Sequence, residues 1–155
     1  MGEHMGQWGR AAGAGQRILI VDDHEANLFA LESALAPLGH PIERATGGDE
    51  ALKAALRGGV AVIVLDLLMP GVGGLDVVRY LKALEATADI PVVLVSAAEP
   101  TTAVAEQAME LGVADLLVKP IDPWALRIKV EYLYRSAAGP VDQGLYLTTR
   151  VTSPS

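Results

Sequence analysis

The sequence contains no cysteine and few aromatic residues, and its acidic side chains outnumber the basic ones. Without cysteine the chain has neither a disulfide framework nor a thiolate metal site. Aromatic residues make up only 5% of a chain that is about half apolar, so its core must consist of Val, Ile, Leu and Ala. Such a core is typical of a parallel sheet covered by helices on both sides. The net charge of −7 argues against direct nucleic-acid binding.

Long apolar runs are also absent. No stretch approaches the roughly 18 apolar residues of a transmembrane helix, and the first residues are rich in Gly, without the apolar segment of a signal peptide. We therefore expect a cytoplasmic protein with no membrane contact. A length of 155 residues favours a single domain with a real core.

Apolar runs and helical periodicities alternate along the chain. The predicted strands cover residues 17–23, 41–45, 60–65, 90–95 and 114–118, and the predicted helices cover residues 26–38, 49–57, 74–84, 100–111 and 123–135. This domain would span residues 17–136. We expect residues 1–16 to be a flexible leader or residues added by cloning. Residues 137–155 would be a linker or tail, with a short ordered piece at 145–147.

The alternation predicts an α/β fold, a doubly wound (βα)5 sheet. Right-handed crossovers between successive strands place all strands parallel in one sheet. Either common doubly wound strand order fits the alternation. The second strand is short and begins at Pro41, which is tolerated at a sheet edge, and this favours the order 2-1-3-4-5.

Polar residues stand where four of the predicted strands end. The first strand ends in Asp22 and Asp23, the third in Asp66, the fourth in Ser96 and the fifth in Lys119. In the order 2-1-3-4-5 these strands are consecutive neighbours. Their carboxyl ends then open into the crevice where sheets of this kind bind ligands.

Three carboxylates in one crevice call for a cation. Two of them about 4 Å apart repel by about 4 kcal/mol at an effective dielectric constant near 20. A donor set of oxygens alone, without His or Cys, selects a hard ion, so we expect Mg²⁺ (or Mn²⁺) before Zn²⁺. A carboxylate beside such an ion, with a Lys and a Ser nearby, is suited to attack phosphorus and accept a phosphoryl group.

Each of these residues also has an ordinary structural explanation. Asp22 and Asp23 precede a helix and could be caps, and Asp66 in a Pro/Gly loop could form an Asx-turn. Ser96 alone carries almost no information. The joint pattern decides, because residues of complementary chemistry at successive strand ends rarely arise by chance.

The chain from about residue 17 to residue 135 resembles the receiver domain of bacterial two-component response regulators, which has a CheY-like, flavodoxin-like fold. The matching segments are Ile18–Asp23, Val64–Gly71 with Gly74, Val93–Ala97 and Val118–Pro120. The segment 112–130 further resembles receivers that are joined to kinase or phosphatase modules.

The resemblance implies a metal site around one phosphoacceptor, Asp66. Asp66 and Asp23 would bind Mg²⁺ through their side chains, and Leu68 would bind it through its backbone carbonyl. Asp22 would act through a metal-bound water.

The resemblance also implies how the phosphoryl group is held. Ser96 would bond it and move on activation, and Lys119 would pair with one of its oxygens. Ala97 is small enough to leave room for it. Pro120 would follow a cis peptide bond, which is accessible before proline.

Two positions depart from the family pattern. Leu116 stands where receivers usually carry a Tyr or Phe that acts as a rotamer switch, so a signal must use the loop after Ser96 and the helix beyond it. Leu68 and Ala98 stand where side chains steer the hydrolytic water in this family. Both are apolar, so we expect a long-lived aspartyl phosphate.

The implied phosphodonor is a sensor histidine kinase or a phosphotransfer protein. The output surface would comprise the helix 101–111, strand 114–118 and the last helix, and its partner is not identified by the sequence. A second copy of the chain, contacted through residues 132–134, is one candidate. The domain takes part in its own phosphoryl transfer and slow dephosphorylation, so we do not expect a turnover enzyme.

Three alternatives remain open. A pseudo-receiver would bind partners without phosphorylation. A haloacid-dehalogenase-type phosphatase would carry a second Asp where Leu68 stands. A nucleotide-binding Rossmann domain would need a Gly-rich turn after the first strand, where this chain has Asp22, Asp23 and His24.

Overall fold

The computed structural model describes residues 15–137. Its elements are β1 (Arg17–Val21), α2 (Glu25–Leu35), η1 (Ala36–Leu38), β2 (Ile42–Ala45), α3 (Gly48–Leu56), β3 (Val60–Asp66), α4 (Gly74–Ala83), β4 (Val92–Ser96), α5 (Thr102–Leu111), β5 (Asp115–Val118) and α6 (Pro123–Ser136). Most of the predicted leader, nearly all of the predicted tail and the predicted ordered piece at 145–147 lie outside the described residues.

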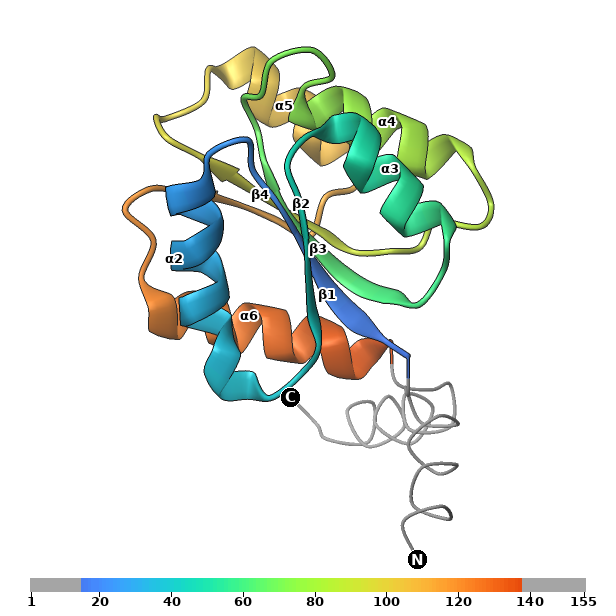
Figure 1. The fold of residues 1–155 in the computed structure, drawn as a ribbon. Helices are drawn as coiled ribbons and strands as arrows, with labels where there is room; N and C mark the ends of the chain where they lie inside the picture. The colour runs from blue at the N-terminus through green and yellow to red at the C-terminus, as the bar shows by residue number, and fades with distance from the viewer. Residues whose placement is uncertain (1–14, 138–155) are drawn as a thin grey trace, which may run out of the picture.

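The five strands form one parallel sheet in the order β2-β1-β3-β4-β5, with helices on both faces (Figure 1). This confirms the predicted fold class and the predicted position of the short second strand at an edge. All seven residues of β3, at the centre of the sheet, are buried. The uninterrupted apolar run at 60–65 is therefore a strand covered on both faces.

Alternate residues along the strands feed two separate cores. Ile18 and Ile20 of β1 face α2 and α6, where they pack with Leu28 and Leu126. Leu19 and Val21 face the other side of the sheet, where α3, α4 and α5 supply mostly small or branched side chains. The sheet thus lies between a layer of two helices and a layer of three helices.

The first helix is shorter than predicted. The apolar spacing continues to Leu38, but the α-helix ends at Leu35 and a turn of 3₁₀ helix, η1, follows. Pro37 explains the difference, because it lacks an N–H group and cannot extend the helical hydrogen-bond pattern. Gly39 ends this turn with φ of 80°, in the left-handed region that Gly adopts without strain.

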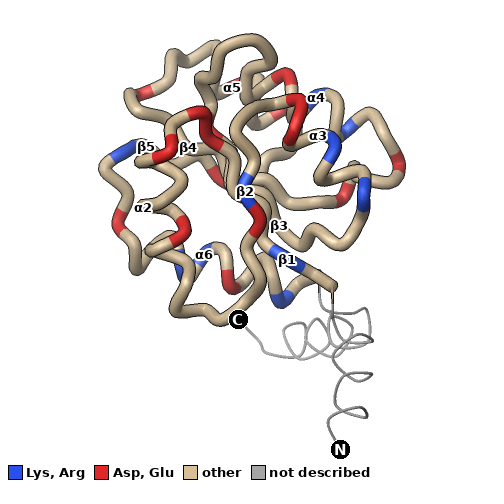
Figure 2. The backbone as a smooth tube through the Cα atoms, viewed as in Figure 1, with Lys and Arg blue, Asp and Glu red and all other residues tan. Residues whose placement is uncertain are grey.

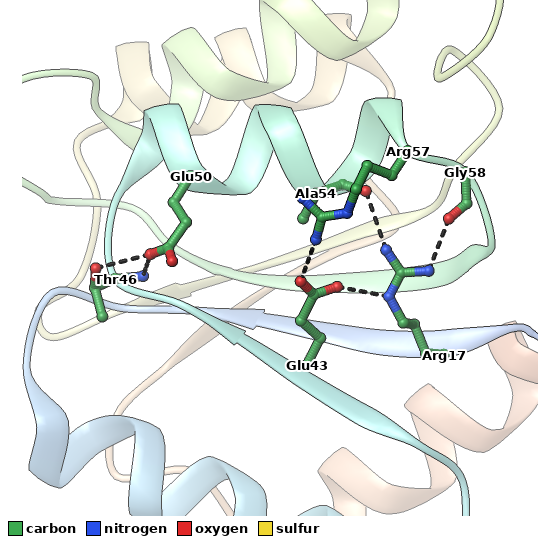
Figure 3. A network of polar contacts seen from close by, with 7 residues as sticks. All are labelled: Arg17, Glu43, Thr46, Glu50, Ala54, Arg57 and Gly58. Carbon is green, nitrogen blue, oxygen red and sulfur yellow. Dashed lines mark hydrogen bonds and ion pairs between the residues drawn. The ribbon is translucent and has the colours of Figure 1, made fainter.

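The edge strand β2 is covered by ion pairs to both helical layers. Glu43 accepts hydrogen bonds from Arg17 of β1, at 2.6 Å, and from Arg57 beyond α3, at 2.5 Å (Figure 3). The Arg17 guanidinium also donates to the carbonyls of Ala54 and Gly58, where α3 ends. On the other face of the strand, Arg44 pairs with two glutamates of α2. Charged edges of this kind disfavour pairing with another chain.

The remaining charges are dispersed over the described chain. Figure 2 shows its basic positions scattered among acidic ones, without a continuous basic stripe. Among the described helices, none combines the length and the hydropathy needed to cross a bilayer.

We predict that Glu43→Gln lowers the free energy of unfolding by about 1–2 kcal/mol, between the values for exposed and buried ion pairs. The reason is that Arg17, whose side chain is only 20% exposed, loses its charged partner. Urea unfolding measures the difference. Arg79→Gln is the control, since the Arg79–Asp76 pair is about half exposed and should contribute within about 0.5 kcal/mol. Equal effects of the two substitutions would contradict the prediction.

Candidate functional site

The register of the sheet brings the ends of four strands together. Val21 of β1 is paired with Leu65 of β3, so Asp22 stands level with Asp66. Hydrogen bonds continue beyond this level: the N–H of Leu67 donates to Val95 at 2.8 Å, and that of Lys119 donates to Ser96 at 2.8 Å. The predicted site residues therefore meet at one edge of the sheet.

Asp22 is the most deeply buried carboxylate at this edge, with 1% of its surface exposed. Its Oδ1 atom accepts hydrogen bonds from the N–H of His24, at 2.9 Å, and from the Asn27 amide, at 3.2 Å. Its Oδ2 atom lies 3.8 Å from the ammonium group of Lys119. Asp22 is thus held by the first turn of α2 on one side and by the end of β5 on the other.

Asp66 is nearly as buried, with 8% of its surface exposed. Burial, followed by the negative charge of Asp22, raises the pKa of Asp66 to about 6. Lys119 and the backbone N–H of Leu68 oppose this rise but do not cancel it. A carboxylate in such surroundings is costly to ionise unless a cation is near.

Asp23 completes the acidic group. Its Oδ1 atom is buried and accepts no hydrogen bond. Nδ1 of His24 lies 3.2 Å from this oxygen. A buried oxygen with unused acceptor capacity is a plain candidate for a ligand to a cation.

His24 lies beside this acidic group, and the sequence analysis did not name it as a site residue. Its Nδ1 atom forms a group with carboxylate oxygens of Asp22 and Asp23 in which all three atoms lie within 4.8 Å of one another. A nitrogen atom therefore lies beside the carboxylate oxygens for which the sequence analysis predicts a magnesium ion. Its signal in the sequence was the run Asp22-Asp23-His24 directly before a helix.

Ser96 and Lys119 close the other side of the site. Ser96 is 2% exposed, and its hydroxyl donates to the carbonyl of Ala98 at 2.5 Å, so it is turned toward its own loop. Ala97 and Ala98, the two residues after Ser96, are exposed. The peptide bond between Lys119 and Pro120 is cis.

Two glycines allow other elements to approach the loop after Asp66 closely. A Cβ atom on Gly74, the first residue of α4, would lie 2.6 Å from the carbonyl oxygen of Asp66. A Cβ atom on Gly48, the first residue of α3, would lie 2.7 Å from the Cβ of Val72. The start of each helix therefore rests directly on the backbone or side chains of this loop.

The positions that depart from the receiver pattern are apolar in the structure as well. Leu68 is 69% exposed beside the acidic group. Leu116 lies on the edge strand β5 and packs, half-buried, against the core formed with α3, α4 and α5. Neither side chain offers a polar group to the site.

Among the described residues, Asp22 and Asp23 bring carboxylate oxygens close enough, with Nδ1 of His24, to share one ion, and Asp66 is not part of this group. Carboxylate oxygens are the ligands that Mg²⁺ prefers, and the free oxygen of Asp23 fits this use. A cavity of about 510 Å³ opens next to the site between α2 and the start of α6, with Lys119, Asn27 and Leu126 in its wall.

Comparison with known proteins gives one consistent result. The family model of the response regulator receiver domain matches residues 18–131. The response regulator PleD of Caulobacter vibrioides is 41% identical over 119 residues, which cover 77% of this chain and 26% of PleD. The cyclic di-GMP phosphodiesterase response regulator RpfG of Xanthomonas campestris is 35% identical over 135 residues, covering 84% of this chain and 35% of RpfG.

A solved structure gives the same result. The response regulator receiver protein from Pseudomonas putida superimposes with a TM-score of 0.69 and 32% identity, over 76% of this chain and 96% of that one. The chain thus spans between a quarter and about a third of these two curated relatives but nearly all of the solved receiver. With its carboxylates, lysine and serine at the ends of four parallel strands, it belongs to the family of response regulator receiver domains.

Proposed function

We propose that this chain accepts a phosphoryl group on Asp66 in two-component signal transduction. The observation that carries the proposal is the buried pair Asp22 and Asp66, with the Lys119 ammonium 3.8 Å from Asp22. Burying carboxylates together is unfavourable unless their charge is used to bind a cation and a reacting group.

A metal ion is part of this proposal. Asp23, Asp66 and the carbonyl of Leu68 would hold Mg²⁺ directly, and Asp22 would hold it through a water. The ion would neutralise charge on the transferred phosphoryl group. Mn²⁺ has similar ligand preferences and could substitute.

The transfer itself is an in-line displacement. A carboxylate oxygen of Asp66 forms the new bond to phosphorus as the bond between phosphorus and the imidazole nitrogen of the donor's phosphohistidine breaks. Lys119 pairs with a phosphoryl oxygen, and the small side chain of Ala97 leaves room for the group. The donor is a sensor histidine kinase or a phosphotransfer protein, and the cavity beside Lys119 offers it a place to dock.

The switch would begin at Ser96. Its hydroxyl now bonds the neutral carbonyl of Ala98, and a phosphoryl oxygen offers a stronger, charge-assisted bond. Turning the hydroxyl inward would move the loop that leads into α5, a helix in which only Ala108 is buried. The output surface then comprises α5, β5 and α6, and a partner protein or a second copy of this chain would bind it. Such couplings are typically about 1–3 kcal/mol.

Outside this exchange we assign no turnover reaction to the chain. The domain boundaries of 17–136 and the cytoplasmic location stay predictions. The pseudo-receiver is the second candidate function, favoured by Leu116, which removes the usual aromatic switch from β5.

We predict that a small phosphodonor with Mg²⁺ adds one phosphoryl group to the chain and adds none to Asp66→Asn. Intact-protein mass spectrometry measures the adduct, and chelation of Mg²⁺ should prevent it because the carboxylates need the cation. Asp76→Asn, which removes an exposed carboxylate on α4, should leave the adduct unchanged.

The outcome also separates the alternatives. A wild-type chain without an adduct would favour the pseudo-receiver. Steady hydrolysis of phosphoesters, without an accumulating adduct, would favour a phosphatase.

We predict that the aspartyl phosphate persists for at least minutes in the purified chain, because neither Leu68 nor Ala98 can orient water. Leu68→Gln should shorten the lifetime of the phosphate by at least about threefold. The effect should stay below the rate acceleration of about 10²- to 10⁴-fold that a well-placed general base provides. Decay of the adduct after removal of the donor measures the lifetime. Leu84→Gln, at an exposed leucine beyond α4, is the matched control. A wild-type lifetime of seconds would contradict this account.

We predict that Asp66→Asn stabilises the metal-free chain at neutral pH. The folded-state pKa of Asp66, about 6, lies above the ordinary value of 3.8, so stability is lost as pH rises between these values. Removing the carboxylate should therefore add up to about 3 kcal/mol at about pH 7.5 and almost nothing at about pH 4. Urea unfolding with a chelator at both pH values measures it. A variant less stable than wild type at neutral pH would refute the prediction.

A further inference from the structure

His24 brings a nitrogen donor to the mouth of the acidic site. Its Nδ1 atom lies 3.2 Å from Oδ1 of Asp23 and 3.6 Å from Oδ1 of Asp22. The side chain is 71% exposed, so an ion can reach it from solvent. It occupies the N-cap position of α2 but makes no capping hydrogen bond, so the helix does not require it there.

These separations match those between ligands of one small ion. A tetrahedral Zn²⁺ with bonds of about 2.1 Å places neighbouring ligand atoms about 3.4 Å apart. The two distances from His24 fall on either side of this value. Closing a ligand shell around an ion would therefore need only small movements of the imidazole.

The carboxylates differ in how free they are to take part. Oδ1 of Asp22 already accepts hydrogen bonds from the His24 N–H and from Asn27. Oδ1 of Asp23 is buried and accepts none. The natural ligand pair is thus the free oxygen of Asp23 with the imidazole nitrogen of His24.

We propose that His24 turns the proposed magnesium site into one that also binds borderline divalent ions such as Zn²⁺, with Asp23 and His24 as ligands. The inference rests on the proposed metal site and concerns its selectivity. Mg²⁺ takes oxygen ligands and leaves the imidazole unused, whereas Zn²⁺ readily takes both carboxylate and imidazole. Zn²⁺ would then compete with Mg²⁺ for Asp23.

Isothermal titration of the whole metal-free chain with Zn²⁺, and separately with Mg²⁺, tests the proposal. His24→Gln should weaken Zn²⁺ binding by at least about tenfold, because the loss of even an outer-shell partner of a metal ligand lowers metal affinity by about 10- to 100-fold. The same substitution should leave Mg²⁺ binding unchanged. The imidazole resonances of His24 should shift with Zn²⁺ but not with Mg²⁺. These readouts do not depend on phosphorylation.

The chain offers two matched controls, since it contains three histidines. His40 bonds Glu131 at 2.7 Å and stacks on Tyr134, and His4 lies outside the described residues. His40→Gln and His4→Gln should leave Zn²⁺ binding unchanged.

The outcomes for the two metals are separable. Zn²⁺ affinity that is insensitive to His24→Gln overturns the inference, whatever Mg²⁺ does, and reduces the contact of His24 with Asp23 to an ion pair. Absence of Mg²⁺ binding to the wild-type chain overturns the proposed magnesium site. Zn²⁺ binding that depends on His24 would still support Asp23 and His24 as Zn²⁺ ligands, without the competition with Mg²⁺.

Discussion

Burial of the Asp66 carboxylate beside the carboxylates of Asp22 and Asp23 is the constraint on which the rest of the site depends. The sheet holds Asp22 and Asp66 level and nearly excludes both from water. Lys119 compensates only part of this charge, and the pKa of Asp66 remains raised to about 6. The ionised Asp66 therefore lowers the free energy of unfolding of the domain. Binding of a cation and a phosphoryl group would make the arrangement favourable.

The backbone keeps this unfavourable group in place. Backbone hydrogen bonds between neighbouring strands continue one residue past the end of β3, at Leu67, and one residue past the end of β5, at Lys119. The segments that carry Asp66 and Lys119 are therefore fixed to the sheet. Gly74 and Gly48 let α4 and α3 lie against the loop after Asp66 at distances that a side chain would prevent. By contrast, α5 buries only Ala108, and the hydroxyl of Ser96 bonds only within its own loop. Rigid carboxylates beside a weakly held helix are a suitable arrangement for a switch.

Much of this could be predicted from the sequence, because the apolar runs of the strands, the periodicity of the helices, Pro41 and the polar strand ends are local signals. What could not be predicted depends on side-chain direction and on contacts between distant segments. The apolar spacing predicted a helix that continues to Leu38, but Pro37 ends α2 at Leu35. The imidazole of His24 turns toward the carboxylates, which no spacing indicates. The network of Arg17, Glu43 and Arg57 depends on the register of β1 and β2 and on where α3 ends (Figure 3).

The most direct test of this account is the titration of the Asp66 side chain, followed by ¹³C NMR of its carboxyl carbon without and with Mg²⁺. The account predicts a pKa of about 6 in the metal-free chain. It predicts a clear fall of that pKa once Mg²⁺ is added, because the cation favours the ionised carboxylate. An ordinary pKa that does not respond to Mg²⁺ would contradict the claim that the burial of Asp66 beside other carboxylates organises the site.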